Sequence, residues 1–103
     1  MTRKPWRVII TMTAEFDIST ANEWWREHRQ AAPGLLLREV EAACERIARQ
    51  PRIGTAYLGR PGDLRRLLLR RIGHHLYYGY APSQRVVIVR GLWHAARTLP
   101  PDR

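Results

Sequence analysis

The spacing of apolar residues along the chain predicts one strand, then two helices, then three strands. A β-branched run at residues 7–12 is typical of a short strand. Apolar residues at helical spacing then predict a helix that ends near residue 30, with the stripe Ala14, Ile18, Ala21, Trp25 and His28. A second helix, ending at Gln50 and Pro51, is predicted by the stripe Leu36, Val40, Ala43 and Ile47.

Local signals suggest where the two helices begin. Thr13 is the expected N-cap of the first helix, and Glu15 and Asp17 are expected in its first turn, where the helix dipole favours acids. A break at residues 31–34 follows, and Pro33 can open the second helix. Because this connection is short, the two helices should lie antiparallel as a hairpin.

The C-terminal half predicts a loop and three strands. Residues 51–63 contain three glycines and two prolines, which is typical of a loop. Strands are expected at residues 64–71, 74–80 and 85–93, with turns at Gly73 and at residues 81–84. In the first of these strands arginine and leucine occur on both alternating faces, so the pattern leaves open which face points inward.

The predicted order, β-α-α-β-β-β, indicates a single α+β domain over residues 1–103. Consecutive strands with short connections favour a mainly antiparallel sheet, with the helix hairpin packed on one face. The N-terminal apolar run is too short for a signal peptide or a membrane span, so we expect a soluble cytoplasmic protein that does not contact a membrane. The single cysteine, Cys44, excludes an intramolecular disulfide and a cysteine-based metal cluster.

The positive net charge of the chain predicts an anionic partner. The net charge is +9, and Lys4 is the one lysine among 18 basic residues. Guanidinium groups hold carboxylates and phosphates, so we expect nucleic acid or an acidic protein segment as the partner. Strand arginines that merely protect a sheet edge are the alternative explanation. The expected binding residues are Arg65, Arg66, Arg70, Arg71, Tyr80, Arg90, Trp93, His94 and Arg97.

Three histidines in the same region raise a catalytic alternative. RNA cleavage by a 2′-hydroxyl needs a base, an acid and donors for the developing phosphorane charge. The candidate set for that chemistry is Arg66, His75, His94 and Arg97. Adjacent residues of a strand point to opposite faces, so His74 and His75 cannot share one site. The histidine spacing does not favour a metal site, and we expect no cofactor.

Short sequence motifs follow one another along the chain in a characteristic order. They lie at residues 14–24, 47–54, 64–67, 73–78 and 93–97. This order, over about residues 7–98, resembles the ParE/RelE superfamily of bacterial toxins from type II toxin–antitoxin systems, which includes plasmid stabilisation proteins. The pair Arg65 and Arg66, the strand ending in Tyr77 and Tyr78, and the closing Trp-His-x-x-Arg segment are most similar to the ParE branch.

The resemblance to ParE implies a toxin that inhibits DNA gyrase by binding. It also implies a cognate antitoxin with an acidic C-terminal segment, which neutralises the toxin in a hetero-oligomeric complex. The RelE branch implies instead a ribosome-dependent mRNA endonuclease, but the chain departs from that pattern. Leu68 stands at a basic position, His75 at the position of an expected arginine, and no tyrosine follows Trp93. We therefore expect a binding toxin, with the endonuclease and a non-toxic relative as alternatives.

Overall fold

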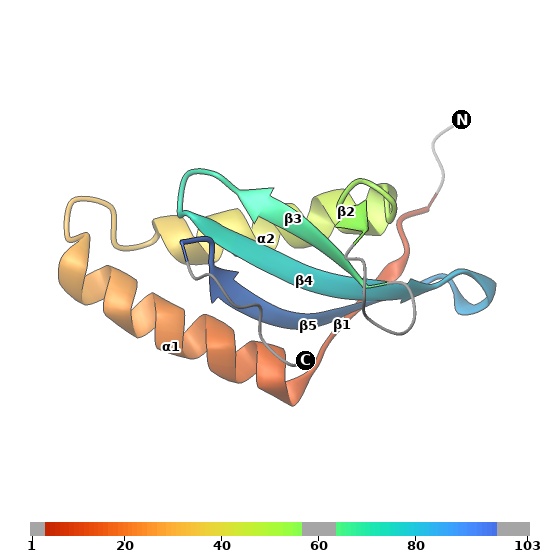
Figure 1. Ribbon diagram of the computed structural model, residues 1–103, viewed down its shortest axis with the longest axis horizontal. Helices are drawn as coiled ribbons and strands as arrows, with labels where there is room; N and C mark the ends of the chain where they lie inside the picture. Colours follow the sequence, from red (N-terminus) through yellow and green to blue (C-terminus); the bar gives the residue numbers. More distant parts are fainter. Residues whose placement is uncertain (1–3, 57–63, 97–103) are drawn as a thin grey trace.

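The computed structural model describes residues 4–56 and 64–96, which form two helices on a five-stranded sheet (Figure 1). The helices are α1 (Met12–His28) and α2 (Leu35–Arg49). The strands are β1 (Arg7–Ile10), β2 (Thr55–Ala56), β3 (Arg65–Leu69), β4 (His74–Ala81) and β5 (Val86–His94), and a short 3-10 turn, η1 (Pro82–Gln84), joins β4 to β5.

The sheet has the strand order β1-β5-β4-β3-β2 and is mainly antiparallel, as expected. Only β1 departs from this pattern among the described strands, because it pairs with β5 in parallel. The prediction that the segment after α2 is a plain loop was wrong for Thr55 and Ala56, which pair with β3 as the edge strand β2. Two residues are too few to show an alternating pattern in the sequence.

Both helices cover the same face of the sheet. The predicted α2 stripe is confirmed, since Leu36, Val40, Ala43 and Ile47 are all buried. On the sheet, Leu67 and Leu69 of β3 belong to the same core cluster, which decides the question that the sequence left open. The members of this cluster on β4 and β5 are Leu76, Tyr78, Val87, Val89 and Leu92. Strand alternation therefore places Arg66 and Leu68 on the face that the helices leave uncovered.

The helix starts differ from the sequence prediction. Thr11, and not Thr13, caps α1: its hydroxyl oxygen accepts a hydrogen bond from the backbone N–H of Ala14 at 3.1 Å. The cap comes early because α1 follows directly on β1, and Thr11 N–H still bonds to the carbonyl of Val89. Glu15 lies in the first turn, but Asp17 lies beyond it and is buried. The second helix begins at Leu35, so Pro33 precedes it and does not open it.

A β-bulge in β5 changes which residues face the core. Tyr77 pairs with Gly91 but Tyr78 pairs with Val89, so Arg90 is an extra residue in the ladder. Val89 and Leu92 both belong to the core cluster. The two residues between them, Arg90 and Gly91, therefore lie toward the uncovered face.

A buried phenol joins the sheet to the turn after α2. The hydroxyl of Tyr78 donates to the carbonyl of Pro51 and accepts from the N–H of Gly54, each at 2.8 Å. Burial raises the pKa of Tyr78, which keeps this donor protonated. A Cβ on Gly54 would lie 2.7 Å from the phenol oxygen and 2.8 Å from the carbonyl oxygen of Arg66. The close approach therefore requires glycine at position 54.

We expect Tyr78→Phe to lower the free energy of unfolding by about 1–3 kcal/mol, because a buried N–H and a partly buried carbonyl lose their partner. Tyr80→Phe is the matched control, since the Tyr80 hydroxyl accepts from Nε of Arg52 in an exposed position. The control should change stability by less than about 0.5 kcal/mol. Urea denaturation measures both, and equal losses in the two variants would contradict a structural role of the Tyr78 hydroxyl.

Candidate functional site

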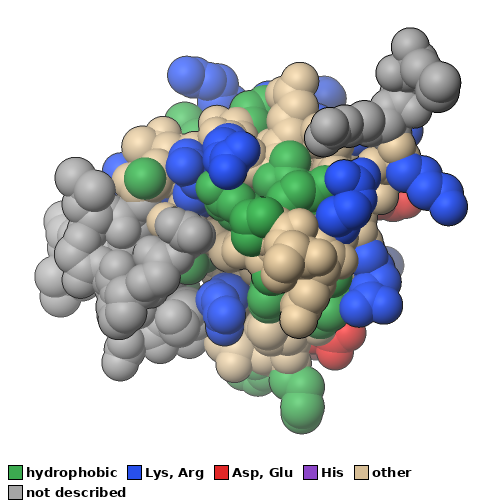
Figure 2. Space-filling model, turned by 90° about the vertical axis from the view of Figure 1, so that its right-hand side faces the viewer, with side chains coloured by type: hydrophobic (Ala, Val, Ile, Leu, Met, Phe, Trp, Pro, Cys, Tyr) green, Lys and Arg blue, Asp and Glu red, His purple; other side chains and the backbone are tan. Residues whose placement is uncertain are grey.

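The described strands and turns carry basic residues and no acids, whereas the helices carry both. Every Asp and Glu in the described part of the chain lies on α1 or α2, whereas the strands and turns carry arginine. Figure 2 shows one end of the molecule, where Lys and Arg side chains surround a hydrophobic area and acids appear only at its margin. The sheet side is therefore the part of the protein that attracts an anionic partner.

The strand arginines nevertheless lie in three places rather than on one surface. Arg66 and Arg90 lie on the uncovered face of the sheet. Arg70 and Arg71 lie just beyond β3, and Nη1 of Arg71 is 3.5 Å from Oε2 of Glu39 on α2. Arg65 shares its face with the buried leucines of β3 and lies toward the β4–β5 turn. The described arginines that were expected to bind an anionic partner therefore do not form one shared basic surface.

At the β4–β5 end, arginine and aromatic side chains hold the chain together. The rings of Trp6 and Tyr80 are 6.0 Å apart, and the guanidinium groups of Arg52 and Arg65 lie 5.6 and 5.7 Å from the Tyr80 ring. Arg65 also donates to the carbonyl of Gly54 at 2.8 Å. Arg65 and Tyr80, both expected in the binding surface, thus fix the turn after α2 against the sheet.

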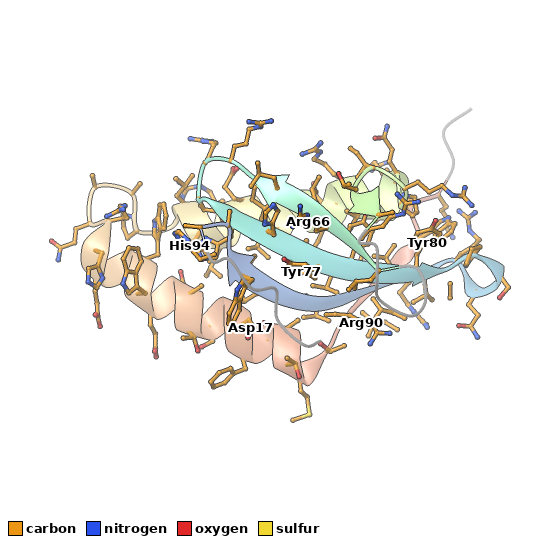
Figure 3. All side chains as sticks on the ribbon, in the orientation of Figure 1. Asp17, Arg66, Tyr77, Tyr80, Arg90 and His94 are labelled. Atoms are coloured by element: carbon orange, nitrogen blue, oxygen red, sulfur yellow. The ribbon has the colours of Figure 1, made fainter. Side chains whose placement is uncertain are left out.

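The remaining candidates on the sheet form two neighbouring rows. Strand register places Arg66, Tyr77 and Gly91 opposite one another, and Leu68, His75 and Trp93 in the next row. Figure 3 shows Arg66 and Tyr77 on this side of the sheet and Arg90 further along β5. We call this surface the outer face, defined as Arg66, Leu68, His75, Tyr77, Arg90 and Trp93.

The outer face combines cations with one imidazole. Burial and the neighbouring guanidinium of Arg66 both lower the pKa of His75, so its ring is neutral at neutral pH. The His75 and Tyr77 rings are 6.2 Å apart and edge to face. Chemically, this surface can hold an anion through Arg66 and Arg90 and can accept one proton at His75.

His74 and His94 lie on the other side of the sheet. They pair across β4 and β5, with ring centroids 5.1 Å apart. As expected for adjacent strand residues, His74 and His75 face opposite ways. The set proposed for RNA cleavage is therefore divided: Arg66 and His75 share the outer face and His94 does not, while Arg97 lies outside the described residues.

The two histidines border a pocket of about 540 Å³ between α1 and the sheet, which Asp17 also lines. The carboxylate of Asp17 accepts a hydrogen bond from the N–H of Leu92 at 3.1 Å. This acceptor is needed because β1 ends opposite Val89, so it does not extend far enough to pair with Leu92. Asp17 was expected only in the first turn of the helix, although an acid within an apolar stripe already signals a buried partner.

The described residues contain neither a cluster of metal ligands nor a membrane-spanning helix. No group of three His, Cys, Asp or Glu side chains is placed to hold a metal ion within residues 4–56 and 64–96. Burial, and the nearby Glu41, raise the pKa of Cys44, which disfavours the thiolate form. In the described chain neither helix combines the length and the apolarity that spanning a membrane would require.

Burial also lowers the pKa of His74 below its ordinary 6.5, although the hydrogen bond to the carbonyl of Ile72 opposes this shift. The unfolded chain therefore binds a proton at His74 more readily than the folded one. Stability should be full above about pH 6.5 and should fall as the pH drops through the lower folded pKa. Urea denaturation at pH 7.5 and 5.5 should show a smaller loss of unfolding free energy in His74→Gln than in the unaltered protein. An equal loss in both proteins would contradict the role of His74 in this pH dependence.

Comparison with known proteins identifies the family. A model described as ParE toxin of type II toxin–antitoxin system, parDE, matches residues 8–99. A search of curated proteins gives no match. The chain is similar to the RelBE2 toxin–antitoxin complex from Mycobacterium tuberculosis, with a TM-score of 0.63 and 22% identity over 90% of this chain and 94% of that one. It is also similar to the chromosomal ParDE system from P. aeruginosa, with a TM-score of 0.61 and 14% identity over 86% of this chain and 95% of that one. A third similar structure is the intact E. coli RelBE complex, with a TM-score of 0.55 and 21% identity over 89% of this chain and 99% of that one.

At these identities the structural likeness shows a shared fold, and it includes both ParDE and RelBE systems. It confirms the predicted α+β architecture. The family model covers most of the sequence. The chain therefore belongs to the ParE toxin family of type II toxin–antitoxin systems.

Proposed function

We propose that this toxin inhibits DNA gyrase by binding it, without chemistry of its own, and that a cognate antitoxin neutralises it. The observation that carries the proposal is the division of the histidines between the two sides of the sheet. A general acid–base mechanism needs two proton-transfer groups at one site. On the outer face the one imidazole among the described residues is His75, and the side chain of Tyr77 is buried. His94 and His74 line the pocket on the other side. Membership of the ParE family supports the same reading.

The outer face has features of a protein-binding surface. Arg66 and Arg90 lie on β3 and β5, the two strands that flank β4, so their backbones are fixed in a paired sheet before binding. Arginine and aromatic residues supply most of the energy in many interfaces. The absence of acids from the described strands favours a negatively charged target.

The antitoxin is proposed to bind beside β3. Strand β2 pairs only with Arg65 and Arg66, so the described structure gives Leu67–Leu69 no second neighbouring strand. A groove of about 400 Å³ lies here between α2 and β3, and it is bordered by Arg46, Arg70 and Arg71. An extended acidic segment can pair with this edge and place its carboxylates near these cations. The similar RelBE and ParDE structures are toxin–antitoxin systems, which supports a hetero-oligomeric complex.

A RelE-like endonuclease acting on mRNA at the ribosome is the second candidate. The observation that favours it is the position of Arg66 beside a neutral His75 on the outer face. Arg66 would hold the scissile phosphate, and His75 would accept the proton of the attacking 2′-hydroxyl.

A supercoiling assay with purified gyrase tests the first proposal. We expect the toxin to block supercoiling, and Arg66→Ala with Arg90→Ala to raise the half-inhibitory concentration at least about tenfold, because two central cations are lost. Arg26→Ala, on the exposed side of α1, is the control and should leave inhibition unchanged.

Unaffected supercoiling at saturating toxin would overturn the gyrase proposal. The toxin should then be added to a translation extract, and the mRNA on translating ribosomes should be examined for cuts. Cuts that disappear in His75→Ala would establish the endonuclease instead.

A further inference from the structure

The pocket between α1 and the sheet shares only Trp93 with the outer face, and its other lining residues lie on the helix side of the sheet. Its volume of about 540 Å³ lies within the range of small-molecule sites. Its titratable lining residues are His74, His94 and Asp17, whose carboxylate accepts from the N–H of Leu92. Its aromatic lining residues are Phe16, Trp24 and Trp93. The proposed binding of gyrase and of the antitoxin does not involve His74 or His94. The arrangement of these two histidines therefore requires its own explanation.

The hydrogen bonds of the two histidines fix different tautomers. Nδ1 of His74 is 2.7 Å from the carbonyl oxygen of Ile72. Because a carbonyl only accepts, Nδ1 of His74 carries the proton and Nε2 is a hydrogen-bond acceptor. In His94 the backbone N–H of Ala96 donates to Nδ1 at 3.1 Å. The neutral ring of His94 therefore carries its proton on Nε2, which is a donor.

The two rings thus offer an acceptor and a donor side by side. They pair across adjacent strands, and their planes are inclined by 73°. His74 is only 8% exposed, so its orientation is set by packing as well as by the bond to Ile72. Burial and the adjacent His94 lower the pKa of His74, which preserves the acceptor at neutral pH.

Aromatic side chains give the pocket flat walls. Phe16 and Trp24 are exposed on α1, at 70% and 45% of their surface, although both are large and apolar. The Trp24 ring is held in place by His28, which stacks on it at 4.3 Å with an interplanar angle of 8°. Such walls favour a planar ligand, because stacking on aromatic rings stabilises flat heterocycles.

We propose that this pocket binds a nucleobase. Its exocyclic amino group donates to Nε2 of His74, and the neighbouring ring nitrogen accepts from Nε2 of His94. Adenine and cytosine carry these two groups next to each other. A primary amide carries a similar pair but lacks the ring that would contact the aromatic walls. The base can belong to a free nucleotide or to a single strand, since both present the same edge.

Nitrogen-15 NMR of the histidine rings tests the proposal directly. We expect His74 with its proton on Nδ1 and His94 with its proton on Nε2, and both rings should shift when adenosine or cytidine is added. Purine riboside, which lacks the amino group, should bind at least about tenfold more weakly than adenosine, because the acceptor on His74 is then unpaired. His94→Ala should weaken adenosine binding by a similar factor.

Gln84→Ala is the control, because Gln84 is exposed in η1, at the opposite end of β4 from His74, and belongs to neither proposed site. It should leave adenosine binding unchanged. A short oligoadenylate that binds more tightly than adenosine monophosphate would support the proposal and identify a strand as the source, while equal binding would identify the nucleotide.

The proposal is overturned by the opposite tautomers, by equal affinity for adenosine and purine riboside, or by shifts at both histidines that only the antitoxin produces. Each result is independent of supercoiling inhibition, so failure here leaves the gyrase proposal unaffected.

Discussion

The structure depends on a sheet that is covered by helices on one side only. In a strand, alternate side chains point to opposite faces, so each core residue fixes the direction of its neighbours. Leu67 and Leu76 pack beneath the helices, and this packing turns Arg66 and His75 to the other side. The outer face is thus a consequence of the core, and no separate scaffold is needed to bring its residues together.

The alternation of side chains on this sheet also explains why the number of arginines in the strands overestimates the number on the binding surface. Arg65 lies on the core side of β3 and donates to the carbonyl of Gly54, next to the buried hydroxyl of Tyr78. Arg71, beyond the end of β3, has Glu39 as a partner on α2. Of the described arginines on β3 and β5, Arg66 and Arg90 remain on the outer face, and Arg90 lies there because a bulge shifts the alternation of β5.

The sequence predicted the elements well where periodicity was strong, as in the buried stripe of α2, and it correctly separated His74 from His75. It did not decide the inner face of β3, because Arg65 can occupy that face only when the turn after α2 supplies carbonyl acceptors. The position of Asp17 in an apolar stripe signals a buried partner, but it does not identify the N–H of Leu92, since that need arises from where β1 ends in space. These are tertiary relations that local patterns do not encode.

The assignment of the outer face as the target surface is tested most directly by hydroxyl-radical footprinting of the toxin with and without gyrase. His75 and Trp93 lie on the outer face, whereas Met12 and Phe16 are exposed on α1. Binding should reduce oxidation of His75 and Trp93 and leave Met12 and Phe16 unchanged. Protection of Met12 and Phe16, with His75 and Trp93 still fully reactive, would contradict it.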